Sequence, residues 1–306
     1  MDVLARVVPF FLLIGVGVVA ARTRLLDMVG ARALSAYVFW IAFPALLIHS
    51  LSAMQPPDSA MAIGLAAYLV GMASPLLAIV AIGRLRGWPR QQRAGAGMAS
   101  IAANTAFLGA PLAVSLFGPA AAAPGSAMVA IDCTIIMLIA TWTLTHAAGE
   151  ASLRRTGLAA ARNPLVIAAM TGLALCLTGY QPIGPLNDAL GLLRATASPV
   201  GLVALGVVVG LEFARPARED VAPVLTSVAF RLFLAPVLVW LATGLVGADP
   251  TFRATATLIA ACPTAVSVFI QTRTLGVFSR GGAMAVVLAT IVAAVSLPLI
   301  GGVLAH

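Results

Sequence analysis

The sequence contains no lysine, and only 9% of its 306 residues are charged. Soluble globular domains carry about 25% charged residues, so the chain falls outside that class. Without lysine it has no P-loop for nucleotide hydrolysis, and it also lacks the GxGxxG, HExxH and GxSxG motifs and the paired acidic motif of membrane prenyltransferases. We therefore expect no enzymatic activity and no ATP-driven transport by this chain alone.

Cysteine is scarce as well. The three residues Cys133, Cys176 and Cys262 all lie in apolar segments and show no metal-ligand spacing. Isolated cysteines of this kind behave as small buried hydrophobes. The sequence therefore predicts no metal site and no bound cofactor, while coupling of function to an H⁺ or Na⁺ gradient stays open.

Long apolar runs dominate the sequence, with 61% hydrophobic residues and a mean hydropathy of +1.05. Ten windows of about 20 apolar residues are each long enough to cross a hydrocarbon core of about 30 Å. We number them helices 1 to 10: 3–21, 33–52, 61–83, 94–116, 126–147, 163–180, 189–212, 222–246, 253–275 and 282–304. The prediction is an all-α integral membrane protein with ten transmembrane helices. The first segment lacks the basic start and cleavage pattern of a signal peptide, so we expect a retained helix.

The arginines indicate how these helices are oriented. Fourteen of the 18 basic residues lie in alternate loops: Arg22, Arg24, Arg32, Arg84, Arg86, Arg90, Arg93, Arg154, Arg155, Arg162, Arg215, Arg218, Arg273 and Arg280. Under the positive-inside rule this bias places those loops in the cytoplasm and both termini outside. The net charge of +8 is thus a topology signal and does not indicate a nucleic-acid partner.

The longest cytoplasmic connection, residues 148–162, separates a first half of five helices, 1–147, from a second half, 163–306. An odd number of helices per half makes the second half enter the membrane from the opposite side. Residues that interrupt helices recur in order at an offset of about 155 to 161 residues: Pro44 with Pro199, Pro75 with Pro236, and Asn104 with Pro263. We interpret the halves as inverted five-helix repeats.

Helices 4 and 9 are each broken by a polar run that contains proline, residues 104–111 and 261–267. In hydrocarbon, the backbone groups freed by such a break need protein or water around them, so each break indicates a site. At a rise of 1.5 Å per residue both breaks lie about 15 Å from the face where their helix starts, near the membrane midplane. Secondary transporters bind substrate at such breaks. The candidate binding residues are Asn104, Thr105, Gly109, Pro111, Pro263, Thr264 and Ser267.

Two of the charged residues within predicted helices are candidate functional groups. Asp132 in helix 5 is a candidate proton carrier or cation ligand, because a carboxylate in a membrane is costly; helix capping or a place in an outer vestibule is the alternative. Arg231 in helix 8 is a candidate to pair with Asp132 or to receive an anionic substrate. If helix 8 starts later than expected, the Arg231 guanidinium reaches the membrane interface instead.

Helix 7 contains a small-residue packing motif, Gly206-Val-Val-Val-Gly210. Small residues at this spacing let two helices approach closely. The motif serves either a homodimer or a contact within the chain, and the sequence leaves both open.

These runs together resemble the auxin efflux carrier family, in its bacterial branch, which is related to the bile acid/sodium symporter fold. The resemblance covers essentially the whole chain and rests on five runs: Ser35 to Leu47, Asn104 to Leu112, Asn163-Pro164, Ser198 to Gly206, and Ala261 to Phe269. It implies two inverted five-helix repeats in which the broken helices 4 and 9 cross. It also implies a scaffold of helices 1, 2, 6 and 7, often dimeric, and a transport domain of helices 3–5 and 8–10 that moves against it like an elevator. A bacterial inner (plasma) membrane location follows from the same resemblance.

We therefore expect a secondary transporter of a small organic anion, a carboxylate, driven by an ion gradient or the membrane potential. The site residues named above would bind the anion, and Asp132 and Arg231 would couple or gate transport. Ser267 stands where the family often has asparagine, and the Asn-Pro-Asn-Thr run of plant auxin carriers is missing, which argues against auxin. The alternatives are a sodium-coupled symporter of a neutral or cationic solute, with sodium on Asn104 and Asp132, and a non-transporting membrane ligand sensor.

Overall fold

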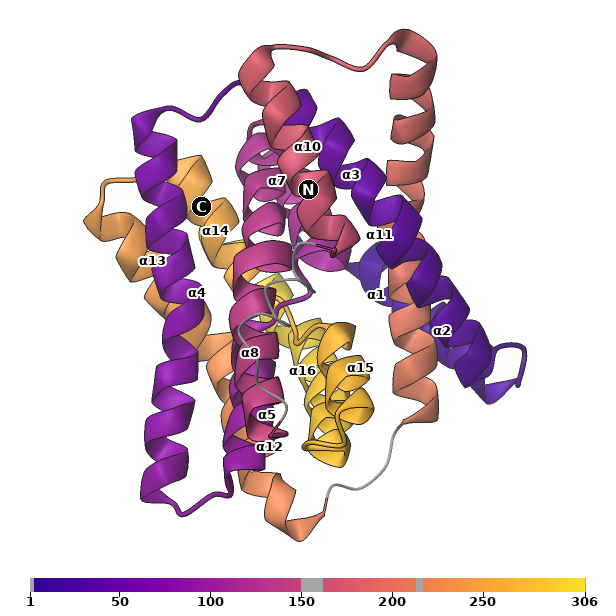
Figure 1. Cartoon of the computed structure of the whole chain (residues 1–306), viewed down its shortest axis with the longest axis vertical. Coiled ribbons are helices and arrows are strands. Elements are labelled where there is room, and N and C mark those ends of the chain that lie inside the picture. The colour runs from indigo at the N-terminus through magenta and orange to yellow at the C-terminus, as the bar shows by residue number, and fades with distance from the viewer. Residues whose placement is uncertain (1–2, 150–161, 213–216, 306) are drawn as a thin grey trace.

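The structure is a computed structural model that describes residues 3–149, 162–212 and 217–305 (Figure 1). Within these ranges every regular element is a helix, apart from an isolated antiparallel bridge between Ala103 and Thr264. Seven helical segments are long and apolar enough to cross a membrane: Val3–Arg22, Met28–Ser52, Ser59–Leu85, Pro119–Ala147, Gly184–Leu211, Arg218–Leu245 and Ser279–Leu304. Two shorter apolar helices are Thr105–Phe117 and Pro164–Thr178. The chain is thus an all-helical multi-pass membrane protein, as its hydropathy predicts.

The first half of the chain follows the predicted order of segments. Its elements are α1 (Val3–Arg22), α2 (Met28–Tyr37), η1 (Val38–Ala42), α3 (Phe43–Ser52), α4 (Ser59–Leu85), α5 (Arg90–Ile101), η2 (Thr105–Gly109), α6 (Ala110–Phe117), η3 (Pro119–Ala121), α7 (Ala122–Ile131), η4 (Asp132–Ile136) and α8 (Met137–Ala147). Helix starts differ from those predicted by several residues, because polar residues such as Arg32 continue a helix past the apolar run. Most of the predicted linker 148–162 lies outside the described residues.

The second half contains α10 (Pro164–Thr178), α11 (Gly184–Leu211), η5 (Arg218–Asp220), α12 (Val221–Ala229), η6 (Phe230–Leu234), α13 (Ala235–Leu245), α14 (Pro250–Ala260), α15 (Val266–Thr274) and α16 (Ser279–Leu304). The break in helix 9 separates α14 from α15, as the break in helix 4 separates α5 from η2 and α6. Both predicted interruptions are therefore present in the fold.

Loop residues determine where several helices begin. Asp27, Asp58, Asn163 and Asp249 each accept a hydrogen bond, at 2.7 to 2.9 Å, from a backbone N–H in the first turn of the helix that follows. Such an N-cap satisfies a donor that has no partner within the helix and typically stabilises it by about 1 kcal/mol. Three of the chain's few carboxylates are thus used to start helices.

Four segments contain a π-helical turn, η1, η2, η4 and η6. Such turns widen a helix locally and are frequent at functional sites. Asp132 begins η4, and Arg231 lies within η6. The two charged residues singled out by the sequence therefore both lie where their helix departs from α geometry.

The closest helix contact is between α1 and α11. A Cβ atom added to Gly17 would lie 2.1 Å from the carbonyl oxygen of Val203, and one added to Gly206 would lie 2.0 Å from that of Ile14. Only glycine lets two helix backbones approach so closely. The Gly206–Gly210 motif is therefore used for a contact within the chain.

The helices pack in two groups. In one, α11 contacts α1, α2 and α3, and α3 contacts α10. In the other, α4 contacts α5 and α13, and α5 contacts α8, α12 and α16. In the same group α13 contacts α14, and α15 contacts α16. Figure 1 shows α4 with α13 on one side of the molecule and α11 with α2 on the other. The groups meet where α3 lies against α7 and α11 lies against η2.

Candidate functional site

The two helix breaks contact each other through their backbones. The N–H of Asn104 donates to the carbonyl of Pro263 at 2.8 Å, and the N–H of Ala265 donates to the carbonyl of Ala102 at 2.9 Å. This short antiparallel pairing joins segments that are 159 residues apart in sequence. It supplies the partners that backbone groups need when a helix is interrupted in an apolar surrounding. The predicted association of the two runs is present in the structure.

Arg231 connects the ends of both broken helices. Its side chain is 0% exposed; one terminal nitrogen, Nη1, donates to the carbonyl of Ile101 at 2.9 Å, and the other, Nη2, donates to the carbonyl of Ala260. Ile101 ends α5 and Ala260 ends α14, where the helix dipoles place partial negative charge. The guanidinium thus neutralises two helix C-termini at once. Since α12 begins at Val221, the helix does not start later than expected, and Arg231 is buried ten residues into the segment.

Asp132 is held by hydroxyl groups. Its Oδ2 atom accepts hydrogen bonds from Tyr68, at 2.8 Å, and from Thr105. The residue is 5% exposed, and its Oδ1 atom has no partner within the described structure. Arg231 donates to carbonyls and not to this carboxylate, so the predicted Asp132–Arg231 pair does not form a hydrogen bond here. A buried carboxylate with an unused oxygen is suited to binding a proton or a cation.

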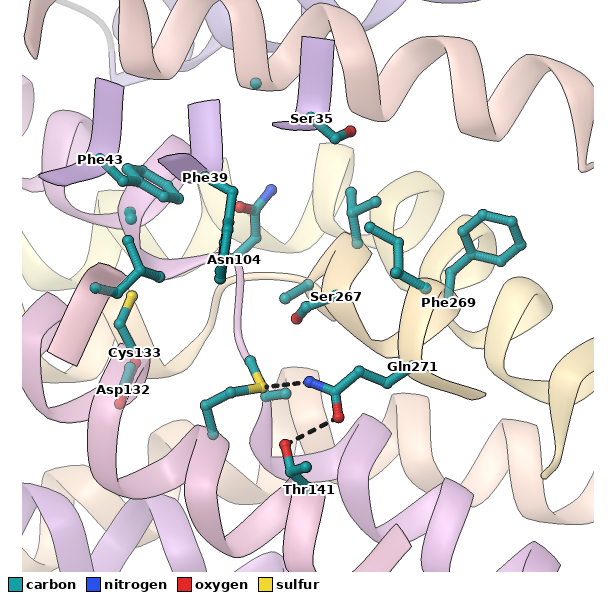
Figure 2. A pocket seen from close by; sticks show the side chains of 18 of the residues that line it. Ser35, Phe39, Phe43, Asn104, Asp132, Cys133, Thr141, Ser267, Phe269 and Gln271 are labelled. Atoms are coloured by element: carbon teal, nitrogen blue, oxygen red, sulfur yellow. Dashed lines mark hydrogen bonds between the residues drawn. The ribbon is translucent and has the colours of Figure 1, made fainter. Parts of the chain in front are cut away.

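A cavity of about 1010 Å³ lies beside the paired breaks. Four predicted site residues line it: Asn104, Thr105, Asp132 and Ser267. Asn104 and Ser267 line the cavity from the two breaks, together with Phe39 and Phe43 (Figure 2). Within the described structure, Asn104 Nδ2 and Ser267 Oγ are buried and have no hydrogen-bond partner. Buried polar groups without a partner are costly, so these two residues are candidates to bind a ligand in the cavity.

Backbone donors reinforce this character. Helix α15 starts at Val266 without a side-chain cap, and η2 starts at Thr105 without one. The first N–H groups of a helix carry partial positive charge and bind anions. These two uncapped helix starts lie next to Asn104 and Ser267, which line the cavity.

The remaining predicted residues lie behind the cavity wall. Thr264 donates to the carbonyl of Ala99 at 3.0 Å and so ties one break to α5. A Cβ atom on Gly109 would lie 3.1 Å from the sulfur of Cys262, so glycine permits close packing there. Pro263 supplies the carbonyl that Asn104 binds, and Pro111 lies in the first turn of α6. These four residues shape the breaks, whereas Asn104, Thr105, Asp132 and Ser267 face the cavity.

Two arginines lie at the mouth of the cavity, Arg32 on α2 and Arg273 on α15. Arg273 forms an ion pair with Glu212, at the end of α11, with 2.5 Å between Nη1 and Oε1. This pair joins an element of each helix group across the mouth. Both arginines belong to the set that the positive-inside rule assigns to the cytoplasmic loops.

Sequence reasoning missed three polar residues of this region. Tyr68 donates to Asp132, and Thr141 donates at 2.9 Å to Gln271, which lines the cavity. Tyr68 is an aromatic residue in the middle of α4, and Gln271 is an uncharged amide within predicted helix 9. The signal that could have found these residues is a hydroxyl or amide side chain within an apolar span. Their partners are not evident from the sequence, because Tyr68 lies 64 residues from Asp132 and Thr141 lies 130 residues from Gln271.

Comparisons with known proteins agree with this architecture. The sequence model of a family described as "Membrane transport protein" matches residues 2–153 and 148–301. These two segments correspond closely to the two predicted halves. The chain is also 28% identical, over 300 residues, to a protein of Rhizobium meliloti (strain 1021) named "Putative malonate transporter". That similarity covers 95% of this chain and 92% of the relative.

Proposed function

Since this chain belongs to the membrane transport protein family, of the auxin efflux carrier type, we propose that it is a secondary transporter of a small carboxylate that binds beside the two helix breaks. The observation that carries the proposal is the pair of unpartnered donors, Asn104 Nδ2 and Ser267 Oγ, in a cavity next to two uncapped helix starts. These groups recognise an anion that accepts several hydrogen bonds. The name of the Rhizobium relative supports malonate as the first compound to test.

The membrane topology in this proposal has ten spans. The broken segments α5 to α6 and α14 to α15 are counted as spans because their breaks satisfy each other's backbone groups. These two broken segments cross at the membrane midplane and approach it from opposite faces, as two inverted repeats require. Both termini lie outside the cytoplasm, and the membrane is the bacterial inner membrane. The cavity then opens inward.

The two helix groups support an elevator mechanism. The group around α11 corresponds to the expected scaffold, and the group around α4, α5 and α14 corresponds to the expected transport domain. Asn104 and Ser267 belong to the second group, so the anion would move with it across the face of α3 and α11. A homodimer through the scaffold remains a prediction, and the Gly206–Gly210 motif is not free to form it.

Coupling is assigned to Asp132. A carboxylate that is 5% exposed and lines the same cavity repels an anionic substrate unless it takes up a proton. Proton binding to Asp132 therefore accompanies anion binding. The fixed guanidinium of Arg231 already neutralises the helix C-termini that a sodium ion would otherwise complement.

Uptake of labelled malonate into proteoliposomes tests the proposal. We expect saturable uptake that an inward proton gradient increases, and at least a tenfold loss in the Asn104→Ala/Ser267→Ala variant. Thr134→Val is the matched control, because Thr134 also lines the cavity but bonds its own helix at the carbonyl of Ala130. No uptake of any carboxylate by folded wild-type protein contradicts the proposal.

The alternatives have distinct outcomes in the same assay. Uptake that requires sodium and not a proton gradient favours a sodium symporter with the ion on Asn104 and Asp132. Saturable binding without any flux favours a membrane ligand sensor. We place the sodium symporter behind the proton-coupled carrier because the unpartnered Nδ2 of Asn104 is a donor and cannot coordinate a cation. We place the sensor behind it because the matched family is described as one of membrane transport proteins.

A further inference from the structure

A second polar position lies on the same face of α15 as Ser267. Gln271 follows Ser267 by four residues, one helical turn, so the two side chains project into the cavity about 6 Å apart along the helix. Figure 2 shows Ser267 and Gln271, with a hydrogen bond between the Gln271 amide and Thr141. The cavity therefore has polar groups at two levels along α15.

The orientation of the Gln271 amide is defined by its neighbours. Thr141 Oγ1 donates to Gln271 Oε1 at 2.9 Å, and Gln271 Nε2 lies 3.3 Å from the sulfur of Met137. A thioether sulfur can accept a weak hydrogen bond but cannot donate one. If the amide were flipped, its oxygen would face the sulfur and form no hydrogen bond there. The Nε2 donor of Gln271 therefore has only the Met137 sulfur as a partner, and both residues line the cavity that Ser267 also lines.

We infer that Gln271, oriented by Thr141, binds a second carboxylate of the substrate, so that the transported anion is a short dicarboxylate. One carboxylate contacts Asn104 and Ser267, and the other accepts a hydrogen bond from Gln271 Nε2 one helical turn away. Arg32 and Arg273, at the mouth, attract a doubly charged anion toward the same path.

This inference rests on the proposed transport function and adds a specificity-determining residue to it. Gln271 also links α15 to α8 through Thr141, so a purely structural role must be separated from recognition. A structural loss weakens transport of every substrate alike. Loss of a contact with the second carboxylate weakens transport of dicarboxylates alone.

The experiment compares malonate with acetate, which has a single carboxylate, in proteoliposomes that contain the wild type or Gln271→Leu. We expect the KM for malonate to rise at least about tenfold, the usual effect of losing one hydrogen bond to a charged group, while the KM for acetate changes less than about twofold. Thr141→Val should change the same ratio in the same direction by a smaller factor. Thr145→Val is the matched control and should leave it unchanged, because Thr145 lines the cavity but bonds its own helix.

Equal rises in both KM values, or an unchanged ratio in Gln271→Leu, overturn the inference while leaving carboxylate transport intact. Failure of the wild type to transport either compound overturns the proposed function itself. Should Gln271→Leu be poorly folded, Gln271→Glu takes its place: the added negative charge should reject malonate more strongly than acetate, and equal rejection of both overturns the inference.

Discussion

The backbone N–H of Asn104 donates a hydrogen bond to the carbonyl of Pro263, 2.8 Å away, so each helix break supplies what the other lacks. The side-chain Nδ2 of Asn104 has no partner within the described structure, so in our proposal it is available to a ligand. Residues 104–111 therefore have two separate roles, one for their backbone and one for their side chains. Backbone pairing holds the breaks, and side chains facing the cavity provide the chemistry.

Asp132→Asn tests the coupling role. The amide keeps the shape and still accepts hydrogen bonds from Tyr68 and Thr105, but it cannot take up a proton. We expect loss of malonate accumulation driven by a pH gradient, with malonate exchange across the membrane retained. Tyr68→Phe is the companion variant, which leaves the carboxylate able to bind a proton. Wild-type accumulation by Asp132→Asn removes this residue from the mechanism.

Arg231→Met tests the connection between the helix ends. The variant leaves the carbonyls of Ile101 and Ala260 without their side-chain donor, at a cost of about 1–3 kcal/mol for each buried group. We expect a lower melting temperature in detergent, with Arg231→Lys intermediate because an ammonium can reach fewer acceptors. Equal melting temperatures for all three proteins would show that the guanidinium does not hold the breaks together.

Glycine substitutions test the α1–α11 contact, with Gly15 on the opposite face of α1 as the control. Gly17→Ala places a methyl group 2.1 Å from the carbonyl oxygen of Val203, whereas a Cβ on Gly15 meets nothing within 4 Å. We expect Gly17→Ala to lower the melting temperature clearly. Gly15→Ala should leave it unchanged or raise it slightly, since alanine favours a helix over glycine by about 1 kcal/mol. The reverse order would contradict the close packing of these two helices.

Charge reversal tests the ion pair at the cavity mouth. Arg273 and Glu212 are partly exposed, with side-chain exposures of 49% and 24%, so their pair contributes at most about 1 kcal/mol to stability. The same energy is enough to shift an opening equilibrium about fivefold. We therefore expect Glu212→Arg to change the transport rate several-fold with little effect on melting temperature. Adding Arg273→Glu should restore the rate, and a double variant no better than the single one argues against a pair that gates the mouth.

Some of the site was predictable because its signals are local. Asn104 and Pro263 interrupt apolar runs at matching places in the two halves, and Asp132 is a carboxylate inside a span. Each of these features is visible in a window of about 20 residues. The partners of Arg231 were not predictable, because a lone arginine in an apolar helix is compatible with an ion pair, an anion site or an interface. Only the fold brings Ile101 and Ala260 to its guanidinium.

The sequence by itself determined the membrane class, the order of the helices and the positions of their breaks, because hydropathy, proline and polar interruptions act within one segment of chain. Tertiary structure alone decided which groups remain unpaired at the centre. Thr264 and Pro263 form hydrogen bonds that hold the two breaks together. The hydroxyl of Ser267 has no partner within the described structure, and Gln271 lines the same cavity one helical turn further along α15. Whether a buried donor is satisfied depends on neighbours from other segments of the chain, and no local pattern encodes them.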